Sequence, residues 1–113
     1  MIIITGSILA RPETFEEIKR LSLAHVRRSR TEEGCLLHSV HVDVENELRL
    51  VFLEHWRDKA AVAKHFADKD ARAFVKAVRG LAASTTEIAL YEGQPIKVDD
   101  LLAQDQGVSM TLP

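Results

Sequence analysis

His65 is the side chain of this sequence best suited to acid–base chemistry. A neutral imidazole accepts a proton near physiological pH, so His65 can act as a general base. Its neighbours Val62 and Phe66 follow the i, i+3, i+4 spacing of one helix face. We therefore expect His65 to point inward. A core histidine hydrogen-bonded to a backbone carbonyl or to Glu54 is the structural alternative.

Glu54 and Trp56 belong to the run from Leu48 to Trp56, whose aliphatic and aromatic residues predict a β-strand. Successive strand side chains point to opposite faces, so Glu54 shares a face with Phe52 and Trp56. Burying a carboxylate is costly without a partner, so Glu54 needs either a specific partner or a partly wet edge. Glu54 can orient His65 or hold a substrate hydroxyl, and Trp56 can stack on a flat substrate. A structural ion pair and a core indole are the alternatives.

The other candidate pocket residues lie on predicted helices and strands nearby. His25 is on the same helical stripe as Ile18 and Ser22, so we expect it to line a cleft between the helices and the sheet. Partial exposure at the end of the helix is the alternative. Apolar walls would exclude water from a reactive intermediate. We expect these walls to come from the aromatic residues Phe52, Trp56, Phe66 and Phe74.

A metal site is not expected. His38 and His41 have opposite parity on one predicted strand, so they cannot face one ion together, and Glu54 and His55 fail the same test. Cys35 is the single cysteine, which excludes an internal disulfide and a multi-cysteine metal site. The sequence also contains no Gly-rich phosphate loop and no Gly-x-Ser-x-Gly elbow.

Residues 1–57 predict a strand, a helix and an antiparallel hairpin. Thr14 and Glu17 form a capping-box pattern at the start of the helix. A short polar segment separates the last two apolar runs, and its length suits a hairpin connection. The expected elements are a strand over 2–10, a helix from about Thr14 to about Thr31, and strands over 36–42 and 48–56.

The remainder of the chain predicts two helical segments and a further strand. Asp58 is a good N-cap for the helix that carries His65. After a polar break at 68–70, helical spacing continues until Gly80, and residues 84–91 predict the fourth strand. The order βαββαβ is that of a ferredoxin-like α+β fold, with helices on one face of an antiparallel sheet.

The helix-free face of such a sheet would expose a large apolar patch, so we expect it to pack against a second copy in a homodimer. Residues 1–93 form the expected domain, and residues 94–113 form an extension. Within the extension, alternation at 96–98 and 108–112 flanks one possible helical turn at 100–103. We expect this extension to add an edge strand or to wrap around the partner.

Size and charge limit the classes of function. At 113 residues the chain is one domain, and its hydrophobic share of 46% and charged share of 28% are ordinary for a globular protein. The formal net charge of −2 and the lack of a wide basic surface disfavour nucleic-acid binding. No segment approaches membrane-spanning length and no secretion signal is evident, so a cytoplasmic location is the default expectation.

Several segments resemble the antibiotic biosynthesis monooxygenase domain family. The resemblance covers roughly Ile2 to Glu92, and the Glu-x-Trp strand followed by a helical histidine is its most specific part. It implies a dimeric α+β barrel of ferredoxin-like protomers and cofactor-free oxidation of quinols or polycyclic phenols. Asp70 stands where many relatives carry a second histidine, so the role of that histidine is not transferred. The matching segments are Glu32–Leu36, Val51–Asp58, Val62–Phe66 and Ala73–Phe74.

The residues and the resemblance together predict a cofactor-independent monooxygenase that uses molecular oxygen, with His65 and Glu54 as catalytic residues. Heme degradation is one alternative, but such relatives use a first-strand Asn, and this chain has Thr5, Gly6 and Ser7 there. A non-catalytic, stress-related ligand-binding dimer is another. An isomerase of a small phosphorylated sugar is also known in the family, but no Arg or Lys cluster is clearly placed in the cleft.

Overall fold

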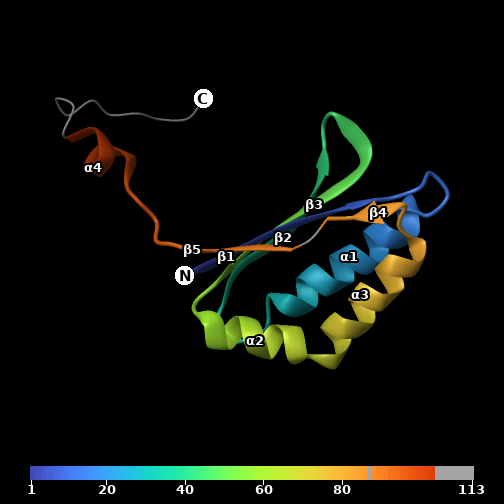
Figure 1. The fold of residues 1–113 in the computed structure, drawn as a ribbon, viewed down its shortest axis with the longest axis horizontal. Coiled ribbons are helices and arrows are strands. Elements are labelled where there is room, and N and C mark those ends of the chain that lie inside the picture. Colours follow the sequence, from blue (N-terminus) through green and yellow to red (C-terminus); the bar gives the residue numbers. More distant parts are fainter. Residues whose placement is uncertain (87, 104–113) are drawn as a thin grey trace.

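The computed structural model describes residues 1–86 and 88–103. Figure 1 shows two layers, with α1, α2 and α3 packed on one face of an antiparallel sheet. The strands are β1 (Ile2–Leu9), β2 (Cys35–Asp43), β3 (Asn46–Trp56), β4 (Ser84–Thr85) and β5 (Ala89–Glu92). The helices are α1 (Phe15–Ser29), α2 (Lys59–Ala67), α3 (Lys69–Leu81) and α4 (Val98–Leu102). The predicted ferredoxin-like α+β fold is confirmed.

The sheet follows the order β2-β3-β1, and both β4 and β5 pair with the free edge of β1. The strand predicted over 84–91 is therefore divided. Thr86 marks the division because its hydroxyl oxygen, rather than a backbone carbonyl, accepts the hydrogen bond of the Ser7 N–H at 2.7 Å. A side chain that replaces a ladder partner interrupts regular pairing. Ile8 faces Thr85 but Thr5 faces Ala89, so the register also shifts by one residue.

The start of α1 differs from the predicted capping box. The Thr14 hydroxyl accepts a hydrogen bond from the Arg11 N–H at 3.1 Å and caps no helix amide. Thr14 has φ −111° and ψ −6°, and not the extended conformation that directs a capping side chain into the helix. Glu17 pairs with Arg20 at 2.6 Å instead of reaching back to the helix start.

The two helices after β3 begin as helix-capping chemistry requires. The Asp58 carboxylate accepts a hydrogen bond from the Ala61 N–H at 2.9 Å, which confirms the predicted N-cap of α2. Asp68 caps α3 in the same way, at the predicted polar break. The prediction that Gly80 ends α3 is wrong, because α3 continues to Leu81. A Cβ at Gly80 would have no neighbour within 4 Å among the described residues.

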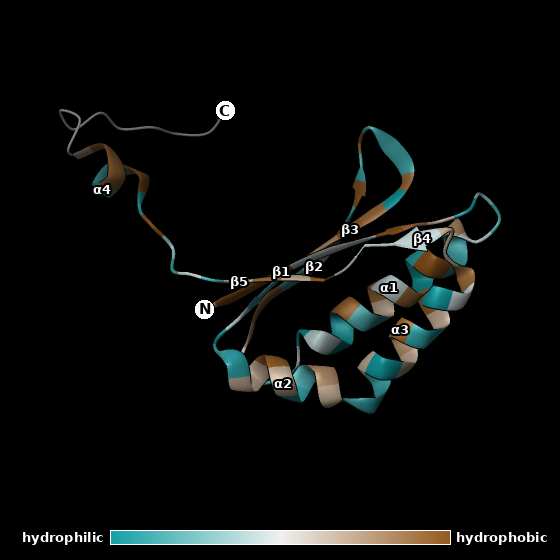
Figure 2. Cartoon of the chain, in the orientation of Figure 1, coloured by the Kyte–Doolittle hydropathy of each residue, from teal (hydrophilic) through white to brown (hydrophobic). Residues whose placement is uncertain are grey.

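Hydrophobic side chains form two clusters between the sheet and the helices. Figure 2 shows β1 starting as a hydrophobic run, whereas the helices alternate hydrophobic and hydrophilic residues around their axes. We call the larger group the apolar cluster; it contains Ile8, Ala10, Ile18, Val26, Leu50, Phe52, Val78 and Ala82. A smaller group at the other end of the sheet contains Ile2, Ile4, Trp56, Ala61 and Val62.

Gly34 allows α2 to approach the sheet closely. Its φ of +85° lies in the left-handed region that favours glycine. A Cβ at this position would lie 2.6 Å from the Cβ of Ala61, so a larger residue would collide with α2. The backbone carbonyl of Gly34 also accepts the Arg57 N–H at 2.8 Å, which fixes the turn before β2 against the end of β3.

Only part of the predicted extension lies within the described residues. The helical turn expected near 100–103 is present as α4, which begins two residues earlier than expected, at Val98. In Figure 1, α4 lies beyond β5 and away from the three-helix layer. The strand-like pattern at 108–112 falls outside the described residues. None of the helices in the described part of the chain combines the length and hydrophobicity that a membrane crossing requires.

Candidate active site

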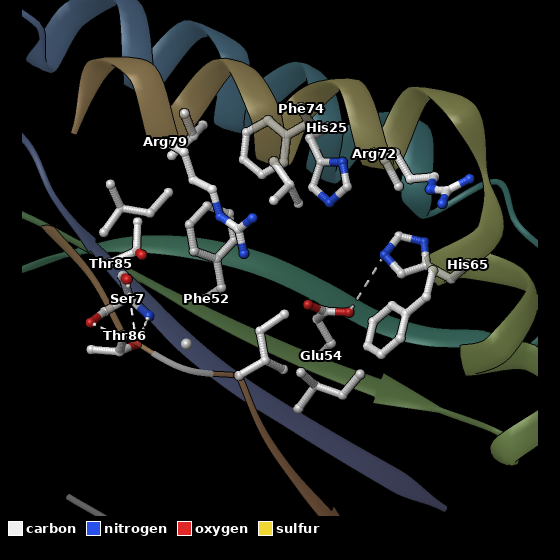
Figure 3. A pocket seen from close by; sticks show the side chains of 18 of the residues that line it. Ser7, His25, Phe52, Glu54, His65, Arg72, Phe74, Arg79, Thr85 and Thr86 are labelled. Atoms are coloured by element: carbon white, nitrogen blue, oxygen red, sulfur yellow. Dashed lines mark hydrogen bonds and ion pairs between the residues drawn. The ribbon is translucent and has the colours of Figure 1, made fainter.

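A cavity of about 560 Å³ lies between the helical layer and the strands β1 and β3. Figure 3 shows side chains from α1, α2 and α3 facing those of β3 across it. Most of its lining is apolar, which suits a small organic ligand. Six of the seven residues predicted for the site line this cavity: His25, Phe52, Glu54, His65, Phe66 and Phe74.

His65 is buried at the end of the cavity, with 4% of its surface exposed. Its Nδ1 lies 3.0 Å from both carboxylate oxygens of Glu32. A carboxylate can only accept, so Nδ1 carries the proton in this contact and Nε2 keeps its lone pair. Nε2 lies 3.9 Å from Oε1 of Glu54, the contact dashed in Figure 3. The pairing therefore sets the tautomer that a base acting through Nε2 requires.

Glu32 was not among the predicted site residues. It follows α1 in the turn before β2, so it is 33 residues away from His65 in the sequence. The run Glu32-Glu33-Gly34-Cys35 contributed to the family resemblance, but its spacing alone does not show which glutamate turns inward. Glu33 instead lies 3.6 Å from Arg57, with 75% of its side chain exposed.

Glu54 is buried with specific partners, as its position on a mainly apolar face requires. Its Oε1 accepts a hydrogen bond from Nε1 of Trp56 at 2.8 Å and lies 3.3 Å from Nε2 of His38. Burial alone would raise the pKa of Glu54. The contact with His38, together with Trp56 and His65, outweighs burial and lowers the pKa. The site therefore contains a buried carboxylate in its charged form.

Trp56 has no exposed surface and does not line the cavity. Its ring packs against His65, with centroids 4.5 Å apart. A substrate in this cavity would therefore meet His65 and Glu54 rather than the indole face. Trp56 positions Glu54 through its N–H and supports the ring of His65 from behind. Phe66 lines the cavity but remains 42% exposed, so it does not turn inward as fully as its helical spacing predicts.

His25 lies in the cavity wall opposite the sheet. Its ring stacks on Phe74, with centroids 4.1 Å apart and planes inclined by 5°. Nδ1 of His25 is 3.0 Å from a guanidinium nitrogen of Arg28. Burial is the main cause that lowers the pKa of His25 to about 3, and His38 and His65 add to it. His25 is therefore neutral at physiological pH.

Three imidazoles lie close together, and two of them, those of His25 and His65, line the cavity. The potential ligand atoms of His25, His38 and His65 all lie within 4.8 Å of one another. They come from α1, β2 and α2, so a comparison of which residues share one face of a single strand could not identify them. The missing signal was the hairpin register, which places His38 directly opposite Glu54 and hence on the same face.

A row of basic residues borders the cavity. Arg72, Lys76 and Arg79 line it from α3, and Figure 3 shows the two arginines. Their spacing of four and three residues places them on one face of the helix. No Arg or Lys cluster was expected in the cleft from the sequence. That expectation is wrong, because these three residues of α3, although exposed, line the border of the cavity.

Known proteins resemble this chain in sequence and in fold. The family model described as antibiotic biosynthesis monooxygenase matches residues 1–77. An uncharacterised protein of Synechocystis is 33% identical over 91 residues; the match covers 80% of this chain but 62% of that protein. A Bacillus subtilis protein named "Putative monooxygenase YcnE" is 29% identical over 92 residues, which is 81% of this chain and 97% of the relative.

Solved structures extend this agreement to three dimensions. A Deinococcus radiodurans crystal structure described as an antibiotic biosynthesis monooxygenase superposes with a TM-score of 0.82 at 27% identity. The match covers 87% of this chain and 98% of that one. The chain therefore belongs to the antibiotic biosynthesis monooxygenase family.

Proposed function

We propose that the protein is a cofactor-independent monooxygenase that oxidises a small aromatic compound, a quinol or a polycyclic phenol, with molecular oxygen. The observation that carries this proposal is an open, largely apolar cavity that His65 reaches from a buried position. A cavity filled by side chains would have favoured a non-catalytic dimer. An accessible base inside an apolar pocket favours catalysis.

In this proposal, Nε2 of His65 removes the phenolic proton of the substrate. The resulting phenolate is electron-rich and supplies the electrons that reduce oxygen. One oxygen atom enters the substrate as a carbonyl oxygen, and the other leaves as water with the two hydrogens lost by the substrate. Glu54, 3.9 Å from Nε2, stabilises the imidazolium that forms. The phenyl rings of Phe52 and Phe74 keep water from the intermediate.

Replacement of His65 tests the proposal. His65→Gln keeps a hydrogen-bond donor for Glu32 but removes the base. We expect oxygen consumption with a reactive quinol to fall by about 10²- to 10⁴-fold, the usual contribution of a general base. His41→Gln is the matched control because His41 is exposed on β2 and bonds only Ser39 among the described residues. Full activity in His65→Gln, with His41→Gln unchanged, would refute the role of His65.

A homodimer in the cytoplasm is part of the same proposal. The face of the sheet opposite the helices carries exposed apolar residues, including Leu37 and Tyr91. Pairing two such faces would bury them, and the extension over 94–113 would add an edge strand or wrap the partner. Sedimentation of the full chain should give a dimer mass, and Tyr91→Lys should shift it toward a monomer. A monomer at micromolar concentration would exclude this arrangement.

The basic residues on α3 favour a second candidate, an isomerase acting on a small phosphorylated sugar. Arg72, Lys76 and Arg79 could hold a phosphate at the cavity edge while His65 and Glu54 move protons. Proton NMR would follow the conversion of a phosphorylated keto sugar. In this case Arg79→Gln should raise KM and leave kcat nearly unchanged. Turnover of the quinol without turnover of the sugar would reject the candidate.

A further inference from the structure

We propose that His25, His38 and His65 bind a divalent transition-metal ion such as Zn²⁺, with Glu54 as a fourth ligand. The three side chains are buried, and their ligand atoms lie within 4.8 Å of one another. Imidazole and carboxylate are common ligands of such ions. Each histidine comes from a different element, so packing of α1, β2 and α2 creates the cluster.

The spacing of the rings matches a tetrahedral site. Their centroids are 5.3, 5.5 and 5.7 Å apart for the pairs His25–His38, His25–His65 and His38–His65. Metal–nitrogen bonds of about 2.0 to 2.1 Å at tetrahedral angles put imidazole centres about 5 Å apart and nitrogens about 3.4 Å apart. Side-chain movements of about 1 Å would therefore close the three nitrogens around one ion.

His38 is the observation that points most directly to a ligand. Its side chain has no exposed surface, and neither ring nitrogen has a hydrogen-bond partner among the described residues. Nε2 lies 3.3 Å from Oε1 of Glu54, an electrostatic contact without full hydrogen-bond geometry, whereas Nδ1 has no polar partner among the described residues. A buried polar group without a partner is rare and costly. A metal ion bound to one ring nitrogen would give this imidazole the partner it lacks.

The neighbours of His65 and Glu54 also suit metal binding. Metal-bound histidines usually donate their other N–H to a carboxylate, which fixes the tautomer. Glu32 holds Nδ1 of His65 in this way, and Nε2 is left free. Glu54 lies next to both His38 and His65, so its negative charge would offset the charge of the ion.

Arg28 opposes metal binding. Its guanidinium only donates, so the 3.0 Å contact makes Nδ1 of His25 an acceptor and leaves the proton on Nε2. That proton must be released or moved to Nδ1 before His25 can bind an ion through Nε2. Arg28 can turn toward Asp70, whose carboxylate already lies 3.9 Å away. We therefore expect the Arg28→Gln variant to bind metal more tightly. The amide oxygen of glutamine can accept a hydrogen bond from Nδ1 of His25, which leaves Nε2 free to bind the ion.

The test is a titration of the full chain, freed of metal with EDTA, with Co²⁺ and with Zn²⁺. We expect one equivalent per chain by calorimetry and the strong visible absorption of tetrahedral Co²⁺. His38→Gln should abolish this absorption. Glu32→Gln, which keeps all ligands, should weaken binding by about 10- to 100-fold. His41→Gln and His55→Gln should bind like the unchanged protein, because these histidines lie outside the cluster.

Several results would overturn the site. They are the absence of binding at submillimolar metal, equal affinity in folded His38→Gln, and loss of binding in His41→Gln. Circular dichroism verifies folding, and Glu32→Gln decides the matter if His38→Gln fails to fold. An ion on Nε2 of His65 would occupy the lone pair that the proposed base needs. Zn²⁺ should therefore inhibit quinol oxidation, a consequence that rests on the proposed function, whereas the titration does not.

Discussion

Strand β3 turns one face toward the helices, but the two halves of that face have very different neighbours. Leu50 and Phe52 belong to the apolar cluster. Glu54 and Trp56 follow Phe52 by two and four residues. Glu54 contacts the imidazoles of His38 and His65 and accepts a hydrogen bond from Trp56. Both halves belong to one continuous strand. The difference comes from the side chains of β3 itself and from the residues that α1, α2 and β2 bring to each half.

Both halves are equally well buried, with exposed fractions of 2% for Leu50 and 0% for Trp56. Burial of Leu50 removes apolar surface from water, which stabilises the fold by about 25 cal/mol per Å². Burial of Glu54 and His38 removes polar groups from water, which opposes folding unless they find partners. The apolar half therefore provides the stability that allows the other half to hold charged and titratable groups in fixed positions.

The largest expected effect comes from disrupting the apolar half. Leu50→Ala should lower the free energy of unfolding by about 2 to 5 kcal/mol, because a cavity replaces a buried side chain. The activity per folded molecule should stay nearly unchanged, since Leu50 does not line the cavity. Urea denaturation measures the first quantity and oxygen consumption the second. Val44→Ala, in the exposed hairpin turn, should change neither. A large loss of activity at unchanged stability would contradict the inference that the apolar half of β3 contributes stability and not catalysis.

The next largest effect should follow from disturbing the support of the polar half. Gly34→Ala forces a left-handed conformation on alanine and places its Cβ against Ala61. We expect a loss of about 1 to 3 kcal/mol in unfolding free energy. Gly80→Ala is the matched control, because no described residue lies within 4 Å of a Cβ there and the position is helical. Thermal melts should show the control to be as stable as the unchanged protein, or more stable.

The third expected effect is a pH dependence confined to the polar half. Groups facing His25 are Arg28 on its own helix, His38, His65 and Glu54. Because the pKa of His25 is lowered from 6.5 to about 3, the unfolded chain binds more protons between these values. Stability therefore falls as pH decreases from about 6.5 toward 3 and is retained above 6.5. In the metal-free protein, we expect the free energy of unfolding to fall by about 1 kcal/mol for each pH unit below 6.5.

Urea denaturation between pH 7 and pH 5 measures this slope before most carboxylates titrate. His25→Phe keeps a ring that can stack on Phe74 but cannot be protonated, so the slope should flatten. His41→Gln removes an exposed histidine and should leave the slope unchanged. An equally steep slope in His25→Phe would show that the pH sensitivity lies elsewhere in the molecule.

Local sequence patterns predicted those features that depend on neighbouring residues. Strand alternation placed Glu54 and Trp56 on the buried face, and the chemistry of Asp58 located the start of α2. The capping box at Thr14 failed because the hydroxyl found a competing backbone N–H three residues earlier, at Arg11. The helix end at Gly80 failed because glycine permits a left-handed turn without requiring one.

The missed site residues depend on contacts between distant segments. Glu32 reaches His65 only because the turn before β2 packs against α2, and His38 meets Glu54 only through the register of β2 with β3. A register shift of one residue would turn His38 to the other face. The direction of Arg79 depends on how α3 is rotated against the sheet. No local pattern determines these three arrangements.

The contact between Trp56 and His65 makes the site observable by fluorescence. Trp56 is the single tryptophan of the chain, so all indole emission arises beside the proposed base. Emission from this residue should therefore change when a ligand or a metal ion contacts His65, and it reports such binding without any added label, through an optical signal built into the natural sequence.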